Sequence, residues 1–219
     1  MFTELIDTLR CPNSHEDDSW LVATSTRAEA RHIVEGRLGC PVCRASFEIR
    51  EGEVLFTTGA VLRATRVLDD AAAFRLAAQL HLVEAPQPIL LTGSWSRAVT
   101  PLRTIVPNVT MFVGDSVTVL TADERVSLLR LPAGAFPLAA GALRALALDA
   151  SHSTPGHLIS AARVVRPSGR LVMPASTAID DALWLVIASD SDVIVAERLA
   201  ASSAPIQLRR APVQPLFKT

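Results

Sequence analysis

Three cysteines near the start of the chain have the spacing of a metal-binding site. Cys40 and Cys43 lie in the turn Gly39-Cys40-Pro41-Val42-Cys43, where two intervening residues allow both thiolates to reach one ion. Cys11 opens a similar turn earlier in the chain. Two such turns brought face to face can supply four ligands, so the sequence predicts a zinc site.

The first turn lacks the second cysteine of this pattern, because Ser14 stands in its place. His15 follows directly, and imidazole is a good zinc ligand. His32, between the two turns, is a competing donor. The predicted zinc ligands are Cys11, His15, Cys40 and Cys43. The alternative is that the turns persist without metal and are held by the core of a hairpin.

A second group of reactive side chains gathers at Asp149, Ser151, His152 and His157. These are the residue types of a nucleophile, a base and an orienting acid, and they follow a predicted strand, where α/β folds often carry function. The chain has no GxSxG turn that would expose a nucleophile. We interpret the segment as a capping turn between a strand and a helix, and we predict no catalytic residue.

Residues 1–60 have the pattern of a small β unit. A short helix is predicted at 3–9, strands at 20–23 and 32–38, and a hairpin at 46–50 and 53–56 around Gly52. So small a unit buries little surface by itself, and a bound metal would therefore stabilise it.

Residues 61–219 alternate between strand and helix patterns, which indicates a parallel α/β sheet. Apolar residues at three- and four-residue spacing predict a helix over 61–83. Ser153-Thr154-Pro155 caps a second helix, which ends before Pro167. The predicted strands are 89–91, 109–113, 126–129, 145–148 and 171–173, followed by a closing pair at 192–199 and 205–210.

The first sixty residues resemble the small zinc-ribbon proteins that bind and activate methyltransferases. The resemblance lies in LIDTLRCP, residues 5–12, and in GCPVCRASFEIREGEVLF, residues 39–56. It implies an exposed edge and apolar surface that pair with a methyltransferase domain.

Residues from about 65 to 200 resemble class I S-adenosylmethionine (SAM)-dependent methyltransferases. The most specific match is the run RVVRPSGRLV, residues 163–172, which resembles the family's helix leading into its fifth strand. LPAGAFPL, residues 131–138, is similar to the loop before its fourth strand. The resemblance implies that Gly93 follows the first strand at the cofactor turn. It also implies that Asp115 stands where an acid meets the cofactor's ribose.

The cofactor turn departs from the family pattern. Members of the family have several glycines there, which let the backbone approach the cofactor closely. Here the turn is Thr92-Gly93-Ser94-Trp95-Ser96-Arg97, with one glycine and two bulky residues. We expect Trp95 and Arg97 to occupy or narrow the place of the cofactor. The sequence therefore predicts that SAM is not bound.

Composition gives weaker indications about partners and compartment. Residues 1–60 hold six Arg against ten Asp and Glu, a net charge of −4, which counts against nucleic acid as the partner of this module. No apolar run is long enough to span a bilayer, and the N-terminus has no signal-peptide pattern. Two of the three cysteines lie in one CPxC turn, which is typical of a reducing compartment, so we expect a cytoplasmic protein.

The sequence thus predicts two domains, a zinc-ribbon-like module at 1–60 and a degenerate methyltransferase-like domain at 61–219. The predicted fold is a Rossmann-like, mostly parallel sheet with a small β module attached. The predicted function is non-catalytic binding or regulation, in which the ribbon could cap its own neighbouring domain. The expected partner is a protein, either a methyltransferase or a second copy of this chain. The alternative is an active SAM-dependent methyltransferase with an atypical cofactor loop, acting on a small molecule or on RNA.

Overall fold

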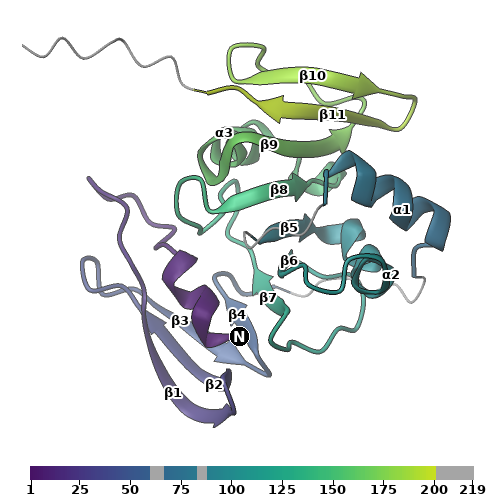
Figure 1. The fold of residues 1–219 in the computed structure, drawn as a ribbon. Helices are drawn as coiled ribbons and strands as arrows, with labels where there is room; N and C mark the ends of the chain where they lie inside the picture. Colours follow the sequence, from purple (N-terminus) through teal and green to yellow (C-terminus); the bar gives the residue numbers. More distant parts are fainter. Residues whose placement is uncertain (60–66, 83–87, 201–219) are drawn as a thin grey trace, which may run out of the picture.

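The computed structural model describes residues 1–59, 67–82 and 88–200. The strands in these ranges form one mixed sheet of eleven, in the order β1-β2-β3-β4-β7-β6-β5-β8-β9-β11-β10 (Figure 1). β1 and β10 therefore lie at the two edges of the sheet. Within the described ranges, no helix is long and apolar enough to cross a membrane.

The N-terminal part of the chain builds one end of the sheet. Its elements are the 3₁₀ helix η1 (Thr3–Thr8) and the strands β1 (Val22–Glu29), β2 (His32–Gly39), β3 (Ser46–Arg50) and β4 (Glu53–Leu55). All neighbours among these four strands are antiparallel. The predicted hairpin is confirmed, and Gly52 supplies the left-handed backbone (φ +77°) that its turn needs. β1 continues beyond its predicted end because it pairs with the whole of β2.

The rest of the described chain builds the other seven strands and the helices. Its elements are α1 (Asp70–Gln79), β5 (Ile89–Thr92), η2 (Gly93–Ala98), α2 (Val99–Ile105), β6 (Met111–Gly114), β7 (Val126–Arg130), β8 (Leu143–Ala147), η3 (Ala150–His152), α3 (Pro155–Val164), β9 (Val165–Pro174), β10 (Trp184–Ser189) and β11 (Val193–Arg198).

The seven strands after β4 carry the Rossmann-like part of the fold. Numbered from β5, they stand in the order 3-2-1-4-5-7-6. The first five run parallel, and β11 joins β9 antiparallel. The order reverses between β5 and β8, the position where α/β sheets of this kind hold their ligands. The predicted fold class fits only in part, because four more strands extend the sheet and its described helices are few.

The predicted helix over 61–83 and the predicted closing pair also differ from the structure. α1 begins at Asp70 because the Asp69 carboxylate accepts the Ala72 N–H (2.8 Å) as an N-cap. Residues 61–66 and 83 of the predicted helix lie outside the described residues. The closing pair was predicted wrongly. β11 pairs with the apolar segment Trp184–Ser189, which was not predicted as a strand, and residues 205–210 lie outside the described residues.

Alternate residues of the central strands face two separate cores. In β6, Phe112 packs on one face, with η1, α3 and the N-terminal strands, while Met111 and Val113 pack on the other, with α1 and α2. This alternation is the expected consequence of the two-residue period of a strand.

The N-terminal strands are joined to the Rossmann-like part by backbone pairing as well as by packing. β4 runs parallel to β7, with Glu53 opposite Leu128 and Leu55 opposite Arg130. Arg130 also forms an ion pair with Glu53 (3.2 Å). The N-terminal core, around Leu38 and Ile49, is continuous with the core beneath β6.

Candidate functional site

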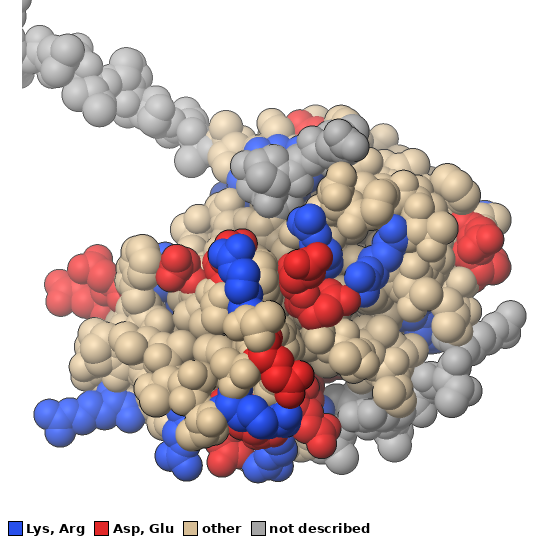
Figure 2. Space-filling model, turned by 60° about the horizontal axis from the view of Figure 1, so that its bottom comes forward, with Lys and Arg blue, Asp and Glu red and all other residues tan. Residues whose placement is uncertain are grey.

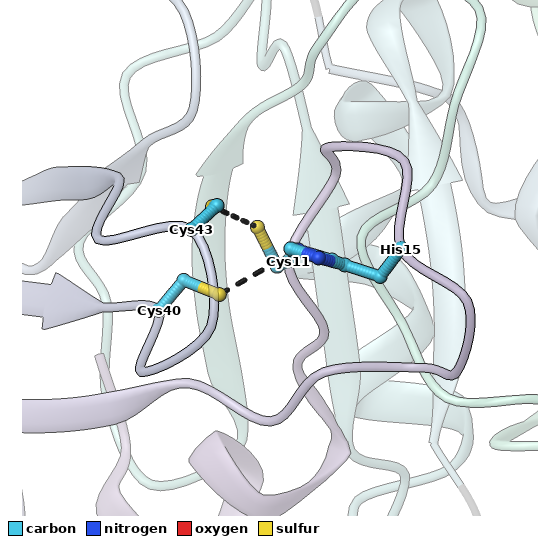
Figure 3. A group of neighbouring side chains, drawn as sticks. All are labelled: Cys11, His15, Cys40 and Cys43. Carbon is cyan, nitrogen blue, oxygen red and sulfur yellow. Dashed lines mark hydrogen bonds between the residues drawn. The ribbon is translucent and has the colours of Figure 1, made fainter.

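The predicted zinc ligands come together at the end of the N-terminal strands (Figure 3). Their ligand atoms, one from each of Cys11, His15, Cys40 and Cys43, all lie within 4.8 Å of one another. Cys40 and Cys43 sit in the turn between β2 and β3. Cys11 and His15 come from the loop after η1, which reaches across to face that turn.

The distances between these donors fit a tetrahedral zinc site. The Cys11 and Cys43 sulfurs are 3.7 Å apart, and the Cys40 sulfur lies 3.5 Å from His15 Nε2. A tetrahedron with Zn–S bonds of about 2.3 Å has edges of about 3.8 Å. Three thiolates and one imidazole are also a donor set that zinc prefers. The cluster could therefore hold zinc.

Neighbouring polar groups support the sulfur ligands. The Asn13 side-chain amide donates to Cys43 Sγ (3.3 Å), and Ser19 Oγ lies 3.2 Å from Cys40 Sγ. Burial raises the pKa of the Cys11 thiol. Burial acts in the same direction on Cys40, but hydrogen bonds from Ser19 and two backbone N–H groups lower the pKa of that thiol overall. A bound cation would displace the remaining thiol protons.

The residue that replaces the missing cysteine and the competing histidine both lie outside the cluster. Ser14 is exposed and is not among the clustered donors. His32 Nε2 lies 2.7 Å from the Met1 amino nitrogen, away from the cysteines. Of the two histidines considered from the sequence, His15 is thus the one that the fold places beside the thiols.

The predicted cofactor residues lie at the carboxyl ends of the central strands. Gly93 follows β5, which borders the point where the strand order reverses, and Asp115 follows β6, the next strand in the sheet. Both have left-handed backbone, with φ of +48° at Gly93 and +49° at Asp115. Their roles toward SAM stay predictions.

The space next to Gly93 is filled by the Asp149 side chain. A Cβ atom at Gly93 would lie 1.9 Å from Asp149 Oδ2. The same oxygen accepts the Ser94 N–H (3.0 Å), and it comes from the loop after β8, on the other side of the reversal. The backbone turn that faces the cofactor in the resembled family therefore faces a carboxylate of this chain.

His152 links this carboxylate to Asp115. Its Nδ1 donates to Asp149 Oδ1 (2.6 Å), and its Nε2 donates to Asp115 Oδ2 (2.9 Å). Burial opposes protonation, but the two carboxylates outweigh it and raise the pKa of His152 to about 9. Burial likewise opposes ionisation of Asp149, yet hydrogen bonds from His152, Ser94 and Ser151 bring its pKa down to about 2. We call Asp115, His152 and Asp149 the acid–imidazole network.

This network is poorly suited to nucleophilic catalysis. Both nitrogens of His152 are held by carboxylates, and an imidazolium at neutral pH cannot accept a proton from Ser151. Ser151 Oγ itself donates to Asp149 Oδ1 (2.8 Å). Asp149 also caps η3 by accepting the His152 N–H, which agrees with the predicted capping turn. His157, with a pKa lowered by burial and by the charge on His152, contacts Thr154 Oγ1 (2.9 Å).

Of the two bulky residues of the cofactor turn, Trp95 contacts other segments through its side chain and Arg97 through its backbone. That they narrow the place of the cofactor stays a prediction. The Trp95 indole N–H donates to the Leu148 carbonyl (3.0 Å), and its ring packs with the core on the α1 and α2 side. The Arg97 carbonyl accepts the Leu68 N–H (3.1 Å). The group that lies against Gly93 is Asp149, which the sequence did not assign to this position. The sequence does show Asp149 and His152 soon after an apolar strand, but this pattern is equally typical of an ordinary helix cap.

No family model and no curated protein matches this sequence. Among solved structures, the chain is similar to the MycE methyltransferase of the mycinamycin biosynthetic pathway, with a TM-score of 0.46, 11% identity, and coverage of 67% of this chain and 53% of that one. It is also similar to geranyl diphosphate C-methyltransferase from Streptomyces coelicolor A3(2), with a TM-score of 0.38, 15% identity, and coverage of 48% and 43%. The chain spans about half the length of these proteins.

Proposed function

We propose that this protein is a non-catalytic binding protein, built on a methyltransferase-like sheet whose cofactor turn is closed by its own side chains. The observation that carries the proposal is the Asp149 carboxylate lying against Gly93, within the acid–imidazole network. A cofactor approaching this turn would meet a charged group where the resembled family has open backbone.

The network would have to be broken to open the turn. Its three side chains are largely buried, with exposed fractions of 8% for His152, 14% for Asp149 and 20% for Asp115. Removing one partner from a buried ion pair typically costs about 3–5 kcal/mol. A ligand would have to replace both the charge and the hydrogen bonds of the group that it displaces. Asp115, the residue predicted to meet a ribose, already contacts His152 and the Leu131 N–H (3.3 Å).

The proposed role of the N-terminal module is to cap this sheet within the same chain. Pairing of β4 with β7 supplies backbone partners to a strand that would otherwise be the edge of the Rossmann-like part. In the resembled activator family, a ribbon performs this task for a separate methyltransferase. Zinc at the four-donor cluster would hold the loop after η1 against the β2–β3 turn.

A thermal-shift titration of the full chain with SAM tests the proposal. We expect no change in melting temperature, whereas a ligand at a hundred times its dissociation constant would add about 2.7 kcal/mol of stability. Added zinc, applied to metal-stripped protein, serves as the positive control for a detectable shift. A clear stabilisation by SAM would contradict the proposal and favour the alternative of an active methyltransferase with an atypical loop.

A further inference from the structure

The two edges of the sheet are chemically different. At one edge, β1 carries charged side chains, and Arg27 forms ion pairs with Glu29 (2.8 Å) and Glu35 (3.4 Å). The pairing of β1 with β2 is also irregular at Arg27. Figure 2 shows basic and acidic side chains intermixed over this end of the molecule. Charges and bulges are the features by which natural sheets prevent unwanted strand pairing.

The other edge has none of these charges, although β10 also shifts register against β11 between Val186 and Ala188. The two edges therefore differ in charge and not in the presence of a bulge. After the buried Trp184, β10 continues as Leu185, Val186, Ile187, Ala188 and Ser189, without a charged residue or a proline. The three large side chains are 52%, 41% and 41% exposed. In the described sheet β10 pairs only with β11, so one side of its backbone has no strand partner there (Figure 1).

The helix layer beside β10 is apolar at the same end of the molecule. Ile159 of α3 is 72% exposed, the most exposed large apolar side chain of that helix. A cavity of about 180 Å³ lies between α3 and the start of β10, lined mainly by apolar residues that include Ile159, Ile179 and Leu183. The apolar surface therefore continues from the sheet layer into the helix layer.

We propose that β10 pairs with β10 of a second copy of this chain, antiparallel and about a two-fold axis. An antiparallel strand paired with its own copy presents the same residues from both sides, which is the self-complementarity of a two-fold interface. Because Leu185–Ser189 is uncharged, this pairing brings no like charges together, and the strand offers no charge by which to select a foreign partner. A two-fold axis perpendicular to the sheet also places α3 of both copies on the same face of the joined sheet.

This inference deepens the proposed binding role by naming a partner, and it rests on that role only for its biological meaning. The SAM titration and the self-association measurement have separate readouts. If the protein is a monomer and does not bind SAM, only the proposed dimer is contradicted. If it is a dimer and binds SAM, only the proposed non-catalytic function is contradicted.

Sedimentation velocity and light scattering of the zinc-loaded full chain test the pairing. The expected mass is twice the 23.4 kDa of one chain. Ile187→Lys should raise the dissociation constant about 100-fold, because two lysines are placed in one interface. Thr26→Lys, at an exposed position of the opposite edge, is the matched control and should leave the mass unchanged. Amide exchange should show protection of 185–189 that increases with protein concentration.

Three results would overturn the proposal. The first is a wild-type chain that remains monomeric up to about 100 µM. The second is a dimer whose dissociation constant is unchanged in both Ile187→Lys and the independent variant Leu185→Lys, each with a wild-type melting temperature. The third is a chain that becomes dimeric only after residues 201–219 are removed, because the edge would then be occupied in the intact protein by its own C-terminal segment.

Discussion

The two clusters of ionisable side chains in this protein are built on opposite principles. At the N-terminal turns, three thiols and an imidazole converge without a positive charge to hold them together. At the strand reversal, two carboxylates converge on an imidazole that is itself the cation. The first cluster could be completed by a metal ion, whereas the second is satisfied by its own residues. A convergent polar cluster therefore indicates a ligand site only when its charges do not already cancel.

The largest effect is expected from removing one metal ligand. Cys40→Ser should reduce the zinc content from about one ion per chain to nearly none. The free energy of unfolding should fall by several kcal/mol, because binding energy at a structural zinc site contributes directly to folding. Metal analysis and thermal unfolding measure the two effects. Ser14→Ala, at the exposed serine beside the cluster, should change neither; a metal-free wild-type chain with an ordered N-terminal part would refute the zinc site.

The contribution of the acid–imidazole network to the free energy of unfolding should depend on pH. Because the pKa of His152 is raised from 6.5 to about 9, its stabilising contribution is complete below about pH 6.5 and is lost as the pH rises through 9. The free energy of unfolding of the wild type should therefore exceed that of His152→Gln by about 3 kcal/mol near pH 6. This difference should become smaller above pH 9. Denaturant unfolding at both pH values measures this. The exposed His81→Gln is the control, and a difference that is independent of pH would argue against a charged His152.

The smallest expected effect concerns the contact between Gly93 and Asp149. Gly93→Ala places a Cβ against the Asp149 carboxylate and also strains a backbone with φ of +48°. In an Asp149→Ala background only the backbone strain remains, so the substitution should cost about 1–2 kcal/mol less. A double-mutant cycle of unfolding free energies measures this coupling. Gly59→Ala, where an added Cβ meets no atom within 4 Å, is the control; zero coupling would mean that the carboxylate moves away freely.

Much of the local structure follows from patterns within the sequence. The CPxC turn, the Glu51-Gly52 hairpin and the capped helix α3 each depend on neighbouring residues, and the structure contains all three. The strand Trp184–Ser189 was missed because its first five residues are a continuous apolar run, which gives no clear period. Its partner β11 was predicted, but with the wrong neighbour.

The chemistry available to this protein can be read from its sequence: a set of soft metal donors, a cofactor turn with a single glycine, and an apolar segment without charges near residue 187. How these groups are used depends on the tertiary structure. It brought His15 rather than His32 to the thiols, set Asp149 against Gly93 from across the strand reversal, and placed the uncharged segment at an edge. The physical reason is that each of these outcomes depends on strand order and loop path, which join residues far apart in the chain and leave no local pattern.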